Sequence, residues 1–196
     1  KLDKLFKEKS WDEEWHLKVL SCSKPTKERI ERVNYYPIIY NKIFSLTGKP
    51  ESILDLGCGL NPFSFIFMNL NKIKYYCVEL GSDYCNFINL YFEKMKIDGE
   101  CITGDLLKML NFKECDVCFL LKVLDSLKLF NLNYSRELLK RINSRFIVVS
   151  FATKSVKSKR KFNRGNWFVR ILNELKFDYD TFEIGDEMFY VIKKFK

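Results

Sequence analysis

Gly57 and Gly59 form a Gly-x-Gly turn between two apolar runs, in the segment SILDLGCGLNPFSFIF. Glycines in such a strand-to-helix turn permit positive φ angles and let backbone N–H groups approach a ligand closely. The third glycine of the dinucleotide-binding pattern is replaced by Pro62, which has no N–H and suits a first helical turn, with Asn61 as a candidate cap. The loop is therefore suited to a nucleotide-like ligand but is not built to cradle a pyrophosphate.

Two acidic residues follow the next two strand-like runs. Glu79 ends the run YYCVEL, about twenty residues after Gly59, where a carboxylate can accept both ribose hydroxyls of an adenosine. Asp105 follows in ITGDLL, where a side chain can meet an adenine amino group. Each acid has a structural alternative, which is to cap the next helix. Together with the glycine turn they favour a site for S-adenosylmethionine, with S-adenosylhomocysteine as product.

The run that would form the fourth strand offers little catalytic chemistry. An Asn-Pro-Pro-aromatic motif for amine methylation belongs there, but Asn61-Pro62-Phe63 follows the first strand, and no Pro-Cys nucleophile is present. Lys122 remains, with Asp125 nearby. Lys122 can fix the cofactor carboxylate or the substrate, or it can extend from a strand end into solvent. Both interpretations stay open.

The elements that must position these residues alternate between strand-like and helical patterns. The pattern predicts five parallel strands separated by helical stretches, and then an antiparallel hairpin turning near Gly185-Asp186. A dinucleotide dehydrogenase would need a second mononucleotide-binding half, for which no room remains. The predicted fold class is α/β: a Rossmann-like, seven-stranded class I S-adenosylmethionine-dependent methyltransferase sheet (residues 48–196) with a small N-terminal helical extension (residues 1–47). The predicted strands span residues 52–57, 74–80, 99–104, 116–123, 145–151, 177–185 and 187–195.

A basic segment follows the fifth predicted strand. Residues 150–173 contain no acid, and the net charge of the whole chain is +9. Phe162, Trp167 and Phe168 interleave with the basic residues, which favours contact with RNA through phosphates and stacking. The alternative is a solvated loop with Trp167 and Phe168 facing the core, and of the three aromatics Trp167 is assigned to the core. The basic residues are Lys154, Lys157, Lys159, Arg160, Lys161, Arg164 and Arg170.

Composition narrows the classes of protein to which this chain can belong. The apolar fraction is 47%, the apolar runs are too short to span a bilayer, and no export signal opens the sequence. Seven cysteines, several of them in strand-like runs, predict buried free thiols in a reducing cytosol. His16 is the sole histidine and is expected on a helix surface, so a histidine-based metal site or triad is not expected. We predict a cytoplasmic protein with no membrane partner and no metal.

With these motifs placed, the sequence resembles the aminoglycoside-resistance methyltransferases that modify N7 of a decoding-site guanine in 16S rRNA. The Gly-Leu-Asn-Pro loop and the Ser-Phe-x-Thr-Lys-Ser loop are the distinctive pair. The sequence departs from the family pattern at three positions: Ser23 replaces a histidine, Ala152 a proline and Arg164 a tyrosine. Its N-terminal region is also shorter than that of the family. The matching segments are LSCSKPTKERI, LDLGCGLNPF, GDLL, FLLKVLDSLK, VVSFATKS, NRGNWF and FYVIKK.

The resemblance implies an S-adenosylmethionine-dependent RNA (guanine-N7) methyltransferase acting on ribosomal RNA, either naked or in the 30S subunit. Guanine N7 carries a lone pair and no proton, so transfer needs alignment and no general base. Glu28 and Lys122 are the candidate positioning residues. The implied cofactor residues are Arg29, Gly57, Cys58, Gly59, Asn61, Glu79, Leu80, Asp105, Leu106 and Lys122. The implied RNA-facing residues are Lys154, Ser155, Lys157, Lys159, Arg160, Lys161, Asn163 and Arg164.

Two rival functions remain. One is a methyltransferase for another RNA site or for a small molecule. The other is an RNA-binding module that has lost methyl transfer.

Overall fold

The computed structural model describes residues 2–8, 10–22, 32–128, 132–155, 158–161 and 166–194. The helices are α1 (Leu2–Leu5), α2 (Glu13–Leu20), α4 (Arg32–Thr47), the 3-10 helix η1 (Asn61–Phe67), α5 (Ser82–Met95), α6 (Leu124–Lys128), α7 (Leu132–Arg141) and α8 (Asn166–Leu175). The strands are β1 (Ser52–Leu56), β2 (Lys74–Glu79), β3 (Asp98–Thr103), β4 (Cys115–Leu121), β5 (Ser144–Ala152), β6 (Lys154–Ser155), β7 (Ser158–Lys161), β8 (Asp178–Ile184) and β9 (Glu187–Lys193).

Seven strands form one sheet in the order β3-β2-β1-β4-β5-β9-β8. Strands β1 to β5 pair in parallel, whereas β9 is antiparallel to both β5 and β8. The central strand β4 reads CDVCFLL and is mostly buried, as expected of a strand covered on both faces, whereas the edge strand β8 is largely solvent-accessible. The predicted seven-stranded sheet and its closing hairpin are confirmed.

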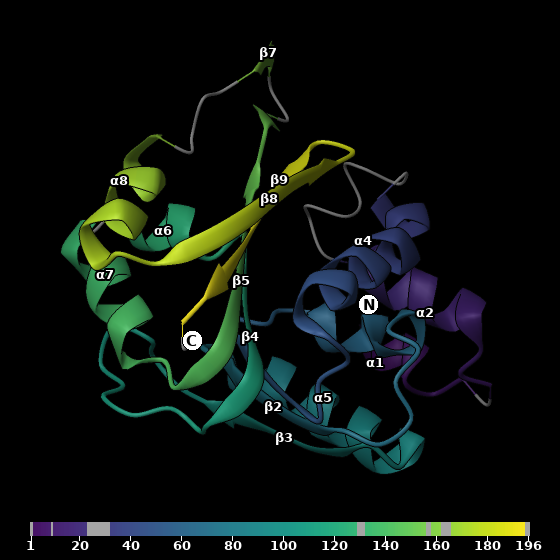
Figure 1. Cartoon of the computed structure of the whole chain (residues 1–196). Helices are drawn as coiled ribbons and strands as arrows, with labels where there is room; N and C mark the ends of the chain where they lie inside the picture. The colour runs from purple at the N-terminus through teal and green to yellow at the C-terminus, as the bar shows by residue number, and fades with distance from the viewer. Residues whose placement is uncertain are drawn as a thin grey trace.

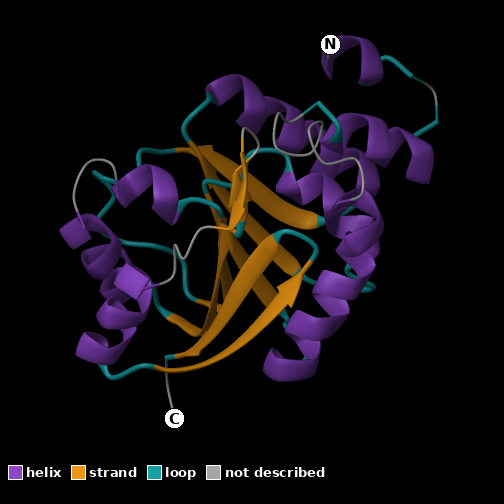
Figure 2. Ribbon diagram, turned by 90° about the horizontal axis from the view of Figure 1, so that it is seen from above, coloured by secondary structure: helices purple, strands orange, loops and turns teal. Residues whose placement is uncertain are grey.

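Helices cover both faces of the sheet (Figure 1, and Figure 2 from above). One face packs against α1, α2, α4, η1 and α5, and the other packs against α7 and α8. Trp15 and Tyr40, from the N-terminal helices, belong to the same apolar cluster as Ile53 and Phe119 of the sheet. The N-terminal helices therefore share a core with the sheet, and a domain boundary at residues 47/48 stays a prediction.

Two predicted helical connections are different in the structure. The expected helix after β1 is a 3-10 helix, with Pro62 in its first turn. Between β3 and β4 the chain makes a single turn at Asp105, whose carboxylate and carbonyl take local N–H groups. The carbonyl of Met109, at the end of this turn, accepts a hydrogen bond from the Arg141 guanidinium of α7.

The basic segment also has backbone structure that the sequence did not suggest. Strands β6 and β7 pair antiparallel as a separate two-stranded ribbon directly after β5. Figure 1 shows this ribbon projecting beyond the end of β5.

Among the described residues, no helix has the length and apolarity that crossing a membrane requires. The seven cysteines are free thiols, as predicted, and all except Cys22 are buried.

Candidate active site

A cavity of about 520 Å³ opens at the carboxyl ends of β1, β2 and β4. This volume lies within the range of roughly 300–1,000 Å³ that is typical of small-molecule sites. The ends of parallel strands meet at one edge of a sheet, so side chains far apart in the sequence converge there. Nine of the ten predicted cofactor residues line it: Gly57, Cys58, Gly59, Asn61, Glu79, Leu80, Asp105, Leu106 and Lys122. The tenth, Arg29, lies outside the described residues, as does Glu28.

Glycine is needed at the two positions of the turn for different structural reasons. Gly57 has φ +66°, and a Cβ there would lie 2.9 Å from Cγ2 of Val123. Its N–H donates to the carbonyl of Val78 at 2.8 Å, which fixes the turn against β2. Gly59 has φ +52°, and a Cβ there would meet nothing within 4 Å, so its backbone faces open space. The first glycine therefore permits close packing, and the second leaves room for a ligand.

Asn61 belongs to a buried polar network beneath this turn. Its side-chain amide donates to Asp55 at 2.7 Å, and its side-chain oxygen accepts from the Tyr40 hydroxyl at 3.2 Å. The Tyr75 hydroxyl also donates to Asp55, at 3.0 Å, while Tyr40 bonds to Ser64 at 2.6 Å. The predicted capping role of Asn61 is wrong, because Leu60 is the N-cap residue of η1 and no side chain caps it. The Asn61 side chain instead ties η1 to β1 and, through Tyr40, to α4.

Asp55 itself is almost completely buried, with 1% of its surface exposed. Burial raises the pKa of its carboxyl to about 7, although the hydrogen bonds from Asn61 and Tyr75 act in the opposite direction. A carboxyl group with this pKa changes its protonation state near neutral pH. Asp55 is not among the residues that line the cavity, so its effect is on the support beneath the glycine turn.

Glu79 holds two backbone segments at the cavity wall. One carboxylate oxygen accepts from the N–H of Gly59 at 2.8 Å, and the other accepts from the N–H of Leu80 at 2.8 Å. The oxygen bonded to Leu80 also accepts from the N–H of Gly81 at 3.4 Å. Of the about four lone-pair sites of a carboxylate, the one that remains for a ligand hydroxyl is on the oxygen bonded to Gly59. The alternative that Glu79 caps α5 is not what the structure shows, since Gly81 is the N-cap residue and no side chain caps that helix.

Asp105 lies across the cavity at the end of β3. Its carboxylate accepts from the N–H of Leu107 at 3.0 Å and lies 3.5 Å from the exposed ammonium of Lys108. Gly104 precedes it at a tight position, where a Cβ would lie 2.6 Å from the sulfur of Met109. Asp105 thus orders its own turn and also lines the cavity. The alternative that it caps the next helix is not what the structure shows, because β4 follows β3 with no helix between them.

Lys122 follows β4 in an unusual backbone conformation, with φ +61°. Its ammonium lies 3.2 Å from a carboxylate oxygen of Glu187, which is 3% exposed. The other oxygen of Glu187 accepts from the Ser150 hydroxyl at 2.6 Å. The lysine is therefore ion-paired and does not extend into solvent, and its side chain is only 20% exposed. No sequence pattern pointed to Glu187, which is simply the first residue of the hairpin strand β9.

Leu20 of α2 and Tyr36 of α4 also line the cavity, and no sequence signal pointed to them. The expectation for His16 was wrong: it lies on α2 but is 1% exposed, with Nε2 3.1 Å from the Tyr91 hydroxyl and Nδ1 2.7 Å from the Asp12 carbonyl. Burial lowers the pKa of His16. Packing of α2 against α5, which sequence periodicity does not report, determines this position.

The predicted RNA-facing residues are only partly described. Lys154 and Ser155 form β6, while Lys159, Arg160 and Lys161 belong to β7. Lys157, Asn163 and Arg164 lie outside the described residues. Since β5 runs parallel to β4, the ribbon begins at the same sheet edge as the cavity. Trp167 and Phe168 pack in the core against Phe151, at ring-centroid distances of 5.7 and 5.1 Å, as the alternative interpretation held.

Comparison with known proteins identifies a matching family and several similar proteins. The family described as "Ribosomal RNA methyltransferase (FmrO)" matches residues 17–191. A 16S rRNA (guanine(1405)-N(7))-methyltransferase of Micromonospora rosea is 29% identical over 184 residues, which cover 92% of this chain and 66% of that protein. The chain thus spans slightly less than two thirds of that relative's length.

Two solved structures have the same fold. The structure of the 16S rRNA methylase ArmA has a TM-score of 0.76 and 26% identity, covering 99% of this chain and 96% of that one. The structure of the 16S rRNA methyltransferase RmtF in complex with S-adenosyl-L-homocysteine has a TM-score of 0.79 and 23% identity, covering 94% and 70%. At that identity the second likeness concerns the fold alone.

Proposed function

This chain belongs to the ribosomal RNA methyltransferase (FmrO) family, and from that premise we propose that it methylates N7 of a guanine in 16S rRNA with S-adenosylmethionine as methyl donor. The observation that carries the proposal is the cavity at the carboxyl edge of the sheet, where the glycine turn, Glu79 and Asp105 converge. The cytoplasm, where ribosomes are found, is the proposed site of action.

The described residues fit this cofactor. Gly59 leaves open space at the turn, and the Glu79 carboxylate has acceptor capacity left for a ligand hydroxyl. Asp105 on the next strand can accept from an amino group, and Lys122 offers a fixed positive charge for a carboxylate. The predicted Arg29, by the family resemblance, completes the set. When bound, S-adenosylmethionine supplies a methyl group attached to a positively charged sulfur.

The residues around the cavity match a reaction without proton removal. Guanine N7 presents a lone pair and no hydrogen, so the chain has only to hold it in line with the methyl group and exclude water. His16, the sole histidine, is buried and hydrogen-bonded away from the cavity. Lys122 and Glu28 are proposed to position the reactants, and neither has to act as a base.

We propose that the basic segment binds the rRNA. Its residues are Lys154, Ser155, Lys157, Lys159, Arg160, Lys161, Asn163 and Arg164, which follow β5 at the edge that holds the cavity. Lys and Arg here would neutralise phosphates, and binding would then weaken as salt concentration rises. Naked 16S rRNA and the assembled 30S subunit are the two candidate substrates.

Methyl transfer from radiolabelled S-adenosylmethionine to 30S subunits and to naked 16S rRNA tests the proposal. We expect stoichiometric labelling of one of them, a single modified guanine on mapping, and loss of labelling in Glu79→Ala. The exposed Glu183→Ala is the matched control and should label as the wild type does. Labelling of another nucleotide would overturn the target, and cofactor binding without any RNA labelling would favour a small-molecule substrate.

The basic segment has a separate test. Lys159→Gln/Arg160→Gln/Lys161→Gln should weaken RNA binding and reduce its salt slope by about 2, at roughly 0.7 per phosphate contact with single strands. Lys42→Gln/Lys72→Gln/Lys74→Gln removes the same charge from exposed sites elsewhere and should change the slope less. Equal effects would show that only net charge matters.

A further inference from the structure

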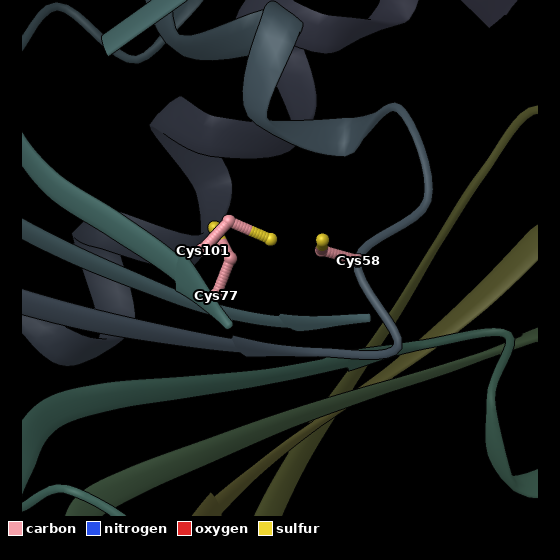
Figure 3. A group of neighbouring side chains, drawn as sticks. All are labelled: Cys58, Cys77 and Cys101. Carbon is pink, nitrogen blue, oxygen red and sulfur yellow. The ribbon is translucent and has the colours of Figure 1, made fainter. Parts of the chain in front are cut away.

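Three cysteine thiols converge beneath the glycine turn. Cys58 lies in the turn itself, Cys77 in β2 and Cys101 in β3, and their sulfur atoms all lie within 4.8 Å of one another. They are 5%, 1% and 4% exposed, respectively. Figure 3 shows the side chains of Cys58 and Cys101 pointing toward each other, with Cys77 beside Cys101. They belong to a cluster of buried side chains that also includes Phe63, Tyr75 and Tyr91.

The spacing of the sulfurs is close to what a metal requires. A Zn–S bond of about 2.3 Å in tetrahedral geometry places two sulfurs about 3.8 Å apart. The three thiols therefore need to close by about 1 Å at most. Cys77 and Cys101 are register partners on neighbouring parallel strands, so two of the three ligands lie on a rigid frame. Cys58 lies in the turn, where a small shift of the backbone can bring the third sulfur into place.

From this arrangement we propose that Cys58, Cys77 and Cys101 bind a thiophilic d10 metal ion, with Zn²⁺ as the preferred occupant. Sulfur ligands in a dry site select such ions over Mg²⁺ or Ca²⁺, which take oxygen ligands. Zn²⁺ leaves a smaller net charge on three thiolates than a monovalent ion does, which matters in a buried site. Each thiol gives up its proton to solvent when it binds the ion.

The three ligands are protein thiols that are at most 5% exposed. A buried ion held by protein thiols fixes the segments that carry them. The proposal is therefore a structural ion outside the methyl-transfer chemistry. It replaces the sequence-based expectation that the chain holds no metal.

The ion would join the three segments that form the cofactor side of the cavity. Cys58 lies between Gly57 and Gly59, Cys77 is two residues before Glu79, and β3 leads from Cys101 to Asp105. Metal binding would thus fix the glycine turn relative to β2 and β3. The site itself rests on thiol geometry alone, so it stands or falls independently of the proposed methyl transfer.

Titration of reduced, metal-free protein with Co²⁺ and then Zn²⁺, under anaerobic conditions, tests the site. We expect a thiolate-to-cobalt charge-transfer band that saturates at one ion per chain and is displaced by Zn²⁺. The melting temperature should rise with Zn²⁺. A reduced wild-type protein without this band would overturn the proposal, as would a Cys58–Cys101 or Cys77–Cys101 disulfide found together with no metal affinity.

Paired variants show which thiols bind. Cys77→Ala/Cys101→Ala should weaken Zn²⁺ binding at least 100-fold. Cys115→Ala/Cys118→Ala removes two equally buried thiols from β4, outside the cluster, and should bind as the wild type does. Cys58→Ala, in the turn, provides a second test if the first variant does not fold. Equal Zn²⁺ affinity in the wild type and Cys58→Ala would contradict the assignment.

Discussion

The two halves of the cavity edge hold their charges in opposite ways. On the glycine-loop side, at the ends of β1 to β3, the carboxylates of Glu79 and Asp105 bond to backbone N–H groups and still face the cavity. On the hairpin side, at β4, β5 and β9, Lys122 is paired with the buried Glu187, which Ser150 also bonds. The first side can exchange hydrogen bonds with a ligand, whereas the second holds one cation in a fixed place.

This difference assigns stability and recognition to separate groups of residues. Removing the Lys122 charge takes an ion-pair partner from a buried carboxylate, which destabilises the fold. Removing a charge from the glycine-loop side leaves only backbone N–H groups near solvent, so the loss should appear in ligand affinity. The following variants test that division.

Lys122→Met should have the largest effect, a loss of about 3 kcal/mol in the free energy of unfolding, because Glu187 then stays buried without its cation. Urea denaturation measures it. Lys193→Met is the control, since its pair with Asp180 is half-exposed at 3.9 Å and is worth about 0.5 kcal/mol. Lys122→Met/Glu187→Gln should recover part of the loss. Equal losses in Lys122→Met and Lys193→Met would remove the distinction between the two sides.

Glu79→Ala should lower the affinity for S-adenosylhomocysteine by roughly 100-fold, or about 2.7 kcal/mol, since it removes a charged acceptor for the ligand. Its stability should change less than that of Lys122→Met. Calorimetric titration measures the affinity, with the exposed Glu183→Ala as the control. An affinity unchanged in Glu79→Ala would mean that its carboxylate serves only the turn at Gly59 and Leu80.

Asp55 lies beneath the glycine-loop side and gives it a pH dependence. Its folded-state pKa is about 7, above the unfolded value of 3.8, so the folded protein retains a proton that the unfolded chain has lost. The contribution of Asp55 to the free energy of unfolding is fully present below pH 3.8 and is lost as pH rises toward about 7. One pKa unit corresponds to about 1.4 kcal/mol, so a loss on the order of 2 kcal/mol is expected between pH 4.5 and pH 6.

Asp55→Asn should remove that slope, because an amide cannot ionise yet can still accept from Asn61 and Tyr75. Urea denaturation at pH 4.5, 6 and 8 compares the variant with the wild type. A slope that persists in Asp55→Asn would assign the pH dependence to another group.

The two sides also differ in how far the sequence alone could predict them. Gly59, Glu79 and Asp105 each follow an apolar strand, so their convergence at one sheet edge follows from parallel topology. Glu187 lies on an antiparallel strand whose place beside β5 is a property of the assembled sheet. Its pairing with Lys122 therefore had no local signal, although Lys122 itself was found.

Contacts between distant segments explain the other differences. His16 was misplaced because α2 packs against α5 through Tyr91, and helix periodicity does not report which neighbour covers a face. The thiols of Cys58, Cys77 and Cys101 lack the short Cys-x-x-Cys spacing of common metal motifs, and only strand pairing unites them. Asn61 was expected to cap a helix, but its side-chain oxygen accepts from the Tyr40 hydroxyl of α4 and its amide donates to Asp55 of β1.

The smallest effect distinguishes Asp105 from Glu79 within the glycine-loop side. Asp105→Asn keeps an oxygen that can accept from the N–H of Leu107 or from a ligand amino group, so the turn can persist. It loses a negative charge, and we expect S-adenosylhomocysteine affinity to fall about 3- to 5-fold, or about 0.7–1 kcal/mol.

Lys108→Gln is the matched control for Asp105→Asn. The Lys108 ammonium is highly exposed and lies 3.5 Å from the Asp105 carboxylate, so its removal should leave the affinity within about 2-fold. A loss in Asp105→Asn as large as that in Glu79→Ala would mean that the charge of Asp105 itself contacts the ligand. No loss in either Asp105→Asn or Lys108→Gln would limit Asp105 to shaping its turn, and would leave Glu79 as the principal acidic contact on this side of the cavity.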